Sequence, residues 1–316
     1  MERRELLKKS AAFGFMAAVP FSALRKLSVD STLADALGPA DGDNSSVKPN
    51  PLKPPAQGRI PVAFLVSEGA VIIDFCGPWE IFGNVMMGGR MDAFRLYTVS
   101  ETMQPIKASG GMKIIPDYTL ETAPAPKVIV LPAQSNSSEA VLEWIRKSSR
   151  TADVTMSVCT GAYLLAQTGL LAGKAATTHH ASYVDFALKF PDIRVKHGVR
   201  FVEDGNLASS GGLSCGLDLA LRVVERYYGR EVAEQTAYDM EYQGQGWASP
   251  DSNAVYATAR ASTNNHPLCT VCSMDIDLAT APKSVYKGQT YYFCTQDHKG
   301  QFEASPEKYL ELYKKR

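Results

Sequence analysis

One stretch, residues 152–180, limits the folds open to this chain more than any other part of it. Residues 154–158 are mostly β-branched or apolar and predict a short buried strand. Cys159 follows directly, and Thr160 and Gly161 lead into a run of strong helix formers. A strand that turns into a helix within one or two residues is the geometry of a nucleophile elbow, which presents one side chain at the tip of a sharp turn. The stretch therefore predicts an α/β fold with a cysteine at that tip.

Two interpretations of Cys159 follow from this position. A thiol at the start of a helix feels free backbone N–H groups and the positive end of the helix dipole, which favour its thiolate form. Cysteine is also among the most buried residue types, and many cysteines at strand ends only pack. The turn leaves both a catalytic and a packed thiol open.

The size and charge of the chain limit its domain count and its partners. It has 316 residues, of which 45% are hydrophobic, enough for one large domain and one small domain. Lysine plus arginine and aspartate plus glutamate number 33 each, so the formal net charge is zero. Since this balance gives no sign of a basic surface, we expect no nucleic-acid partner.

Residues 1–23 differ from the rest of the chain. Arg3 and Arg4 come before two leucines and a lysine, and residues 10–23 are mildly apolar. A charged start and a short apolar stretch are typical of an export signal, whereas a membrane span needs about 20 strongly apolar residues. The paired arginines resemble a bacterial twin-arginine signal, which implies the twin-arginine export machinery as a partner and a periplasmic location. An amphipathic N-terminal helix of the mature domain is the alternative.

Changes in composition mark the expected domain boundaries. Residues 38–58 contain Pro, Gly, Asn, Ser and Lys with almost nothing apolar, which is typical of a solvated linker. A second stretch, rich in Ser, Ala, Asn and Thr, begins at Ser249. We expect a signal and leader over 1–36, a linker over 37–58, a large domain over 59–248, a second linker over 249–265 and a small module over 266–316.

Strand-like and helix-like segments alternate along the large domain. Asp74 is a candidate N-cap of the first helix, and Pro78 fits an early helical position. The alternation predicts a doubly wound α/β layer structure with a mostly parallel sheet. The expected strands cover 60–66, 94–99, 112–116, 127–132 and 154–158, and the expected helices cover 73–82, 139–147, 183–190 and 217–228.

Three separated motifs occur in an order that resembles one protein family. They are Asp74-Phe75-x-Gly77-Pro78-x-Glu80, residues 157–162 together with 169–179, and residues 210–218. Over residues 60–246 the chain resembles the ThiJ/PfpI family, in particular its isonitrile hydratase-like branch. The resemblance implies a flavodoxin-like parallel sheet of the class I glutamine amidotransferase type, and a homodimer.

The resemblance also implies roles for four residues at the carboxyl edge of the sheet, where active sites of such sheets lie. Cys159 would be the nucleophile and Asp74 the carboxylate beside it, titrating with the thiol as a pair and moving one proton. Thr160 would donate its hydroxyl or backbone N–H to developing negative charge. His179 matches a histidine near the cysteine in several branches, with a packed core histidine as the alternative.

Further residues are expected at the pocket or in the core around it. Ala133 and Gln134 stand where the family usually has two glycines, and we expect them to line an oxyanion pocket together with Gly77. Alanine disfavours positive φ, so this departure puts the substrate in question. Cys76 and Cys215 are most simply core thiols, with a bridge between them as the alternative in an oxidising compartment.

The C-terminal segment, residues 266–316, is too short to bury a large core, and domains of this size usually need a metal or disulfide staple. Its aromatic run over 286–293 predicts a β-hairpin with Gly288 at the turn. We therefore expect a small α+β module of the metal-binding type.

Four residues in this module have metal-ligand chemistry and spacing. Cys269 and Cys272 form a Cys-x-x-Cys pair, and Cys294 precedes His298 in a Cys-x-x-x-His pair. Such donors suit a tetrahedral Zn²⁺ or a softer Cu⁺. The segment resembles a YHS domain, a small metal-associated module of the treble-clef type, although Ser273 replaces the family's usual glycine. A disulfide among the three cysteines and a metal-free core are the alternatives.

The resemblance implies an exported bacterial enzyme that uses Cys159 to hydrate or hydrolyse a small electrophilic substrate, as an isonitrile hydratase-like lyase. The large domain would need no cofactor. A glyoxalase-like or amidase-like enzyme, and a non-enzymatic periplasmic protein that senses a small molecule or metal, are the alternatives. We expect no DNA-binding role, because residues 250–316 contain no helix-turn-helix pattern.

Overall fold

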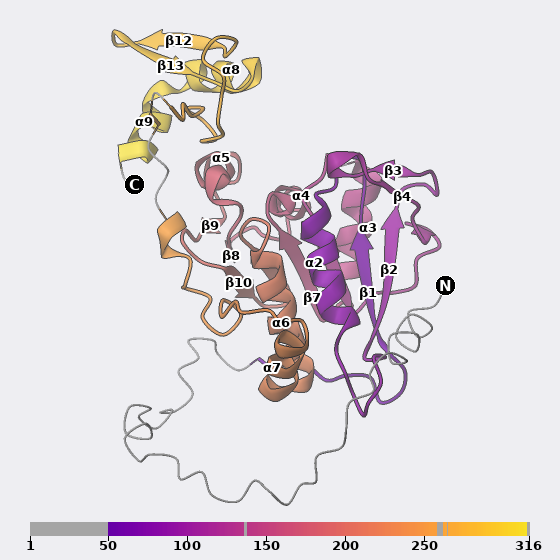
Figure 1. Cartoon of the computed structure of the whole chain (residues 1–316). Helices are drawn as coiled ribbons and strands as arrows, with labels where there is room; N and C mark the ends of the chain where they lie inside the picture. Colours follow the sequence, from indigo (N-terminus) through magenta and orange to yellow (C-terminus); the bar gives the residue numbers. More distant parts are fainter. Residues whose placement is uncertain (1–49, 136–137, 258–261, 264, 315–316) are drawn as a thin grey trace, which may run out of the picture. The chain divides into compact units, whose positions relative to one another are not determined.

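The computed structural model describes residues 50–135, 138–257, 262–263 and 265–314 (Figure 1). The predicted export signal and leader, and most of the first predicted linker, lie outside the described residues. Within the described ranges, no helix has both the length and the apolar content that a bilayer crossing requires.

The large domain is built on one seven-stranded sheet with the order β10-β11-β7-β6-β1-β2-β5. Neighbouring strands of this sheet pair in parallel, except that β10 pairs antiparallel with β11. All residues of β6 and β7 are buried, as expected for central strands covered on both faces. The strands are β1 (Ile60–Leu65), β2 (Phe94–Ser100), β5 (Tyr118–Thr119), β6 (Val128–Leu131), β7 (Val154–Val158), β10 (Phe201–Asp204) and β11 (Leu207–Ser210).

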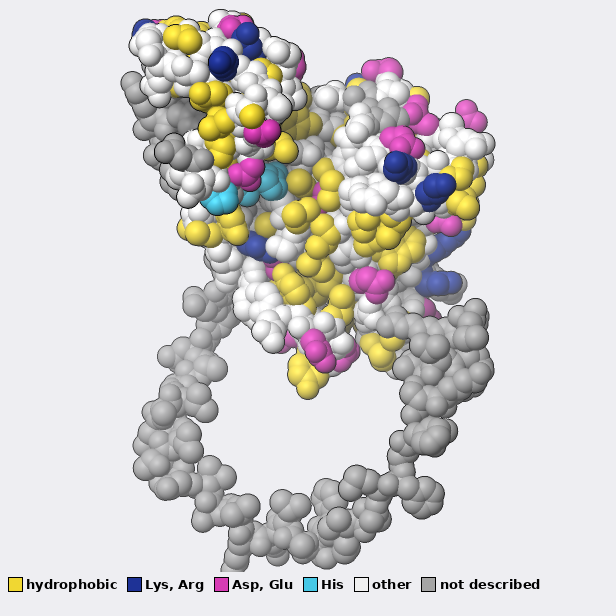
Figure 2. All heavy atoms as spheres, turned by 45° about the horizontal axis from the view of Figure 1, so that its top comes forward, with side chains coloured by type: hydrophobic (Ala, Val, Ile, Leu, Met, Phe, Trp, Pro, Cys, Tyr) yellow, Lys and Arg dark blue, Asp and Glu magenta, His cyan; other side chains and the backbone are white. Residues whose placement is uncertain are grey.

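Helices cover both faces of the sheet and define two cores (Figure 1). One core contains residues of α2 (Ile72–Gly83), α6 (Cys215–Tyr228) and α7 (Arg230–Asp239). The other contains residues of α3 (Glu139–Ser149), α4 (Gly161–Gln167) and α5 (Tyr183–Lys189). The predicted doubly wound α/β architecture is confirmed. On the face that Figure 2 shows, acidic and basic side chains are interspersed, in keeping with their equal numbers.

Two local predictions about the first helix are wrong. The helix begins at Ile72 and its N-cap is Val71, so Asp74 lies inside the first turn rather than at the cap. Pro78 lies in the helix interior, where it cannot donate to the carbonyl four residues earlier. The carboxylate of Asp74 is therefore free to act on groups outside its own helix.

Two predicted boundaries also differ from the structure. Of the segment 112–116, only β4 (Lys113–Ile114) is a strand, and it pairs with β3 (Ile106–Lys107) in a separate hairpin. The predicted second linker does not begin as a linker: Asn253 is buried and donates to the Val199 carbonyl over 3.3 Å. These residues lie against the large domain because their polar groups bond to the start of β10.

The C-terminal module has the predicted hairpin. Strands β12 (Lys283–Tyr286) and β13 (Gln289–Tyr292) pair antiparallel, and both turn residues, Lys287 and Gly288, have positive φ. Such a two-residue turn matches the right-handed twist of the strands. The hairpin is followed by α8 (Gln296–Ala304) and α9 (Pro306–Lys314), and Phe293 and Phe302 are fully buried in the small core.

Candidate active site and candidate metal centre

Cys159 occupies a strained turn between β7 and α4. Its φ is +57°, in the left-handed region that non-glycine residues rarely adopt. A Cβ on Gly161 would lie 2.1 Å from the Leu131 carbonyl oxygen, so only glycine fits where the helix passes the end of β6. The Thr178 hydroxyl donates to the Cys159 carbonyl over 3.0 Å and fixes the turn from the other side. This is the expected nucleophile elbow, and the surrounding backbone maintains its strain.

The sulfur of Cys159 is nearly enclosed, since the residue is only 8% exposed. Burial, followed by the negative charge of Asp74, raises the pKa of the thiol to about 12. The backbone N–H groups of Thr160 and Leu213, together with the Thr160 hydroxyl, hydrogen-bond to the sulfur and act in the opposite direction. The expectation that the helix start would favour a resting thiolate is wrong, because desolvation outweighs these donors.

Asp74 lies beside this thiol with no exposed surface. Its Oδ2 accepts the backbone N–H of Ala133 over 3.1 Å, whereas its Oδ1 is buried without a hydrogen-bond partner among the described residues. Burial raises the pKa of the carboxyl to about 7, and the bond from Ala133 limits the rise. Near neutral pH the pair therefore consists of a protonated thiol and a carboxyl that is close to its midpoint, a state suited to moving one proton.

The three residues expected at an oxyanion pocket have other contacts. The Ala133 N–H donates to Asp74, and the Gln134 Nε2 donates to the Leu65 carbonyl over 3.0 Å. A Cβ on Gly77 would lie 3.4 Å from the Leu217 side chain, so Gly77 lets α2 and α6 pack closely. The donors that face the sulfur come instead from Thr160 and Leu213.

His179 lies in the wall of a neighbouring cavity. Its Nδ1 accepts the Ala181 backbone N–H over 3.3 Å, and its ring is 4.3 Å from that of His180. Burial, followed by the charge of His180, lowers the pKa of His179 to about 4. A Cβ on Gly212 would lie 2.0 Å from the His179 ring, so the two residues are in close contact. Near neutral pH His179 is therefore a neutral packing group of the cavity wall.

The cavity itself has a volume of about 200 Å³, and the sequence analysis did not identify it. Besides His179 and Gly212 it is lined by Arg200, Leu213 and Ser214. The recognised motif over 210–218 contains three of these residues, but it gave no reason to assign a donor to Leu213. Leu213 has φ +51° and is 45% exposed, a conformation that the residue type alone does not predict.

The two other cysteines of the large domain are not bridged to each other, as the simpler of the two expectations had it. Cys76 and Cys215 are free thiols, and burial raises the pKa of each. Cys215 is buried at the start of α6 and lines the cavity.

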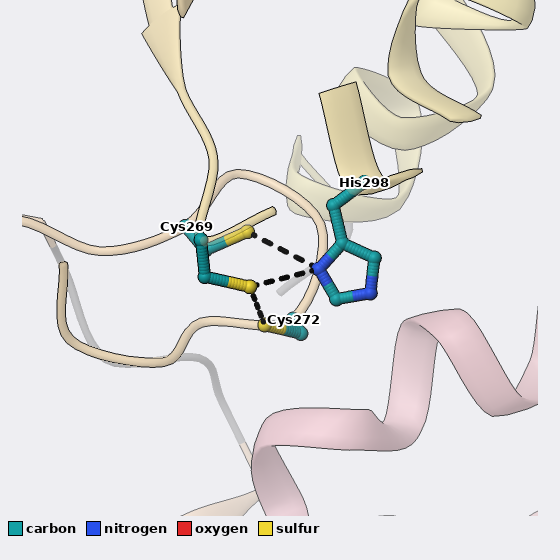
Figure 3. Close-up of side chains that lie close together, drawn as sticks. Cys269, Cys272 and His298 are labelled. Carbon is teal, nitrogen blue, oxygen red and sulfur yellow. Dashed lines mark hydrogen bonds between the residues drawn. The ribbon is translucent and has the colours of Figure 1, made fainter. Parts of the chain in front are cut away.

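Three thiols and one imidazole meet in the C-terminal module. The ligand atoms of Cys269, Cys272, Cys294 and His298 all lie within 4.8 Å of one another. Figure 3 shows the labelled side chains of Cys269 and Cys272, which share one loop, and of His298, from α8, lying close together. The Thr295 hydroxyl accepts the His298 backbone N–H over 3.1 Å and caps α8, which places the imidazole beside the sulfurs.

The distances within this cluster suit a small four-coordinate metal ion. Zn–S bonds of about 2.3 Å in a tetrahedron place sulfurs about 3.8 Å apart. The Cys272 and Cys294 sulfurs are 3.6 Å apart, and the Cys269 sulfur is 3.7 Å from His298 Nδ1. None of the three cysteines is in a disulfide, so the alternative of a disulfide among them is not what the structure shows. The residues fit a Zn²⁺ or Cu⁺ ion.

The electrostatics of the cluster also favour a cation. A hydrogen bond from Cys272 lowers the pKa of Cys269 to about 3, although burial opposes the change. The same bond raises the pKa of Cys272, which holds the shared proton. The hydrogen bond to Cys269 raises the pKa of His298. Cys269 is thus the thiol of the cluster that loses its proton most readily, and metal binding would release the protons of the other ligands.

Comparison with known proteins identifies both domains. The DJ-1/PfpI family profile matches residues 61–226, and the YHS domain profile matches residues 270–313. The chain belongs to the DJ-1/PfpI family and contains a C-terminal YHS domain.

Relatives of the large domain include enzymes and regulators. The chain is 31% identical to isonitrile hydratase from Pseudomonas putida over 186 residues, covering 57% of this chain and 78% of that protein. It is 27% identical to the HTH-type transcriptional regulator CdhR from Pseudomonas aeruginosa, covering 55% of this chain and about half (52%) of the regulator. A solved ThiJ/PfpI family protein from Pseudomonas syringae is 27% identical, with a TM-score of 0.53, covering 59% of this chain and 76% of that one.

Proposed function

We propose that the large domain is a cysteine-dependent enzyme that adds water to a small electrophilic molecule, with isonitrile hydration as the model reaction. The observation that supports this most strongly is the buried pair of Cys159 and Asp74, in which the thiol is strained at the elbow and the carboxyl has a pKa of about 7. The similarity to isonitrile hydratase supports the choice of reaction.

In the proposed reaction the thiol adds across the terminal carbon of the isonitrile. The Cys159 sulfur forms a bond to this carbon, the thiol proton passes to the Asp74 carboxylate, and Asp74 delivers a proton to the same carbon. Water then adds to the resulting thioimidate, the C–S bond breaks, and the products are an N-substituted formamide and the free thiol. The donors from Thr160 and Leu213 stabilise negative charge on the sulfur while the proton is in transit.

The test is hydration of an aliphatic isonitrile by the full chain and by two variants. Cys159→Ser should reduce kcat/KM at least about 10³-fold while circular dichroism and the melting temperature stay close to those of the wild type. Cys76→Ser, a matched removal of a half-buried thiol, should retain activity. Formamide production by Cys159→Ser at the wild-type rate would refute the nucleophile.

One observation favours a second function, in which the pocket binds a ligand without turnover. Cys159 is only 8% exposed, and the family also includes transcriptional regulators. A binding protein of this kind would retain ligand affinity in Cys159→Ser and show no turnover with isonitriles, methylglyoxal or simple amides in the wild type. Product formation with any of these substrates decides for an enzyme, and its identity separates hydratase, glyoxalase-like and amidase-like activities.

We also propose that the YHS module holds one Zn²⁺ or Cu⁺ ion through Cys269, Cys272, Cys294 and His298. Such an ion would act as a structural staple that joins the start of the module to α8. Elemental analysis of the purified chain, before and after substitution of Cys294, tests the site and identifies the metal.

Export and dimerisation complete the proposal. The paired arginines near the N-terminus support twin-arginine export to a bacterial periplasm. Replacement of Arg3 and Arg4 by lysine should then retain the protein in the cytoplasm of an expressing bacterium. The proposed homodimer is tested by light scattering of the purified chain.

A further inference from the structure

The cavity beside the elbow contains a cation whose role the proposed hydration does not explain. Arg200 lines the cavity, and its side chain is 17% exposed. Its Nε donates to Asp218 Oδ2 over 2.6 Å, and its Nη2 contacts the same carboxylate. Asp218 has no exposed side-chain surface, and the Tyr242 hydroxyl donates to its other oxygen over 3.0 Å. A buried acid therefore orients the guanidinium from behind, and its other edge faces the cavity.

The residues around that other edge are polar and short. Arg200 Nη2 lies 3.3 Å from the Ser214 hydroxyl, and Nη1 lies 3.5 Å from Asn253 Oδ1, which is long for a hydrogen bond. No aspartate or glutamate is among the described residues that line the cavity. A guanidinium fork of this kind suits the two oxygens of a carboxylate, which would improve on the long contact to Asn253.

The cavity and the reactive sulfur are neighbours along one edge of the sheet. The Cys159 backbone N–H donates to the Gly211 carbonyl over 3.1 Å, and the Gly211 N–H donates to the Arg200 carbonyl over 2.9 Å. Two strand spacings of about 4.8 Å place the backbones of Cys159 and Arg200 about 10 Å apart. Leu213 connects the two sites directly, because it lines the cavity and its N–H bonds to the Cys159 sulfur.

The size of the cavity limits the ligand. A volume of about 200 Å³ lies below the range of about 300–1,000 Å³ that is typical of pockets for drug-sized ligands. This space suits a short acid, because the wall combines guanidinium, imidazole, hydroxyl and amide groups with the apolar surfaces of Leu213, Cys215 and Tyr256.

We propose that the cavity is a carboxylate-binding subsite and that the natural substrate is a small acid with an electrophilic carbon a few bonds from its carboxylate. Arg200 binds the carboxylate, Asp218 positions Arg200, and the reactive carbon extends toward Cys159. This substrate class rests on the proposed function, whereas binding of the carboxylate does not require turnover.

Binding is measured by calorimetry on the full chain carrying Cys159→Ser, which removes chemistry. The probes are N-formylglycine, the hydration product of isocyanoacetate, and its uncharged ethyl ester. The acid should bind about tenfold or more tightly than the ester, because only the acid offers a charge-assisted bidentate partner to Arg200. Equal affinities, or no measurable binding of the acid, would overturn the proposal.

Asn253→Asp, added to Cys159→Ser, tests whether the carboxylate binds in this cavity. A substitution of Arg200 would leave Asp218 as an unpaired buried charge, whereas Asn253→Asp keeps the pair of Arg200 and Asp218 intact. The new carboxylate faces the guanidinium and competes with the ligand, so the preference for the acid over the ester should disappear. Asn253→Ser loses the same Nδ2 bond to Val199 without adding charge and should keep most of the preference. Arg90→Gln, which removes a well-exposed cation elsewhere, should keep all of it. Retention of the preference in Asn253→Asp would place the anion outside the cavity.

Kinetics with isocyanoacetate and its ethyl ester separate this inference from the proposed function. If the acid binds but neither compound is hydrated by the chain with Cys159 intact, the hydratase proposal fails and the carboxylate subsite stands. If both compounds are hydrated with equal kcat/KM, the enzyme stands and the subsite is refuted.

Discussion

The two domains hold reactive cysteine side chains by opposite physical means. The large domain has an extensive core, and it encloses Cys159 so completely that the pKa of the thiol rises to about 12. The small module has few core residues, and it gathers three thiols and an imidazole in which the pKa of Cys269 falls to about 3. A large core can support a strained, desolvated thiol, whereas a small core uses its thiols as ligands that hold the chain together.

The largest expected effect is loss of the metal from the small module. Structural zinc sites contribute about 10–16 kcal/mol of binding free energy, more than a module of this size stores in its core. Cys294→Ser, or treatment with a strong chelator, should therefore make residues 266–314 sensitive to limited proteolysis while the large domain stays resistant. Mass spectrometry of the fragments measures both regions in one experiment. Cys76→Ser should leave the metal content unchanged. If Cys294→Ser bound as much metal as the wild type and resisted proteolysis equally well, the cluster would not be a metal staple of the module.

The next effect concerns Asp74 and the pH dependence of the large domain. Burial raises the carboxyl pKa from 3.8 to about 7, so the folded chain binds more protons than the unfolded chain between about pH 4 and pH 7. Stability must then fall as the pH rises through this window, by up to about 4 kcal/mol. Asp74→Asn should remove this pH dependence and make the variant more stable than the wild type above pH 7.

Denaturant titrations followed by tryptophan fluorescence measure this effect selectively, because Trp79, Trp144 and Trp247 all belong to the large domain. Asp239→Asn, a change at an exposed carboxylate of α7, is the matched control and should follow the wild-type curve. Parallel pH curves for Asp74→Asn and the wild type would show that the Asp74 carboxyl has an ordinary pKa.

A smaller loss is expected from Gly161→Ala at the elbow. The added Cβ would meet the Leu131 carbonyl oxygen at 2.1 Å and the Pro132 carbonyl oxygen at 2.8 Å, and backbone atoms cannot move aside cheaply. We expect a loss of about 3 kcal/mol in the free energy of unfolding, measured by the same fluorescence titration. Gly83→Ala in α2, where the new Cβ has an ordinary contact at 3.6 Å, should cost little or nothing. If Gly161→Ala also cost little or nothing in the free energy of unfolding, α4 would be able to shift away from the end of β6.

The smallest effect has the opposite sign and lies in the small module. Gly300 is inside α8, and a Cβ there would meet nothing within 4 Å. Gly300→Ala should stabilise the module by about 0.5–1 kcal/mol, because alanine loses less backbone freedom in a helix. The proteolysis assay, run on the chelator-treated chain to unmask a small gain, should show slower cleavage. Faster cleavage would indicate a packing constraint at this position.

Local chemistry made part of this structure predictable. The strand 154–158, the elbow, the 286–293 hairpin and the four metal-type ligands follow from short-range patterns, and the structure has each of them. The antiparallel β10–β11 hairpin was missed because Phe201 to Ser210 mixes acidic, small and apolar residues without a clear alternation. The predicted N-cap of α2, Asp74, was wrong by three residues because tertiary packing decides where α2 begins.

The chemistry of the site was harder to predict than its location. A helix start near Cys159 suggested a thiolate, but the degree of burial, which depends on residues distant in sequence, reverses the direction of the pKa change. The Leu213 N–H that faces the Cys159 sulfur comes from a segment distant in the sequence. The buried pair of Arg200 and Asp218 likewise depends on contacts between distant segments. Neither their residue types nor their spacing signals such an arrangement.

The most direct test of the central claim is detection of the covalent intermediate. The full chain is mixed with an aliphatic isonitrile, quenched with acid within one turnover, and digested for peptide mass spectrometry. The account predicts a mass increase equal to one isonitrile on the peptide that contains Cys159, and its absence in Cys159→Ser. Rapid formamide production with an unmodified Cys159 peptide, or an adduct on another cysteine alone, would contradict the account.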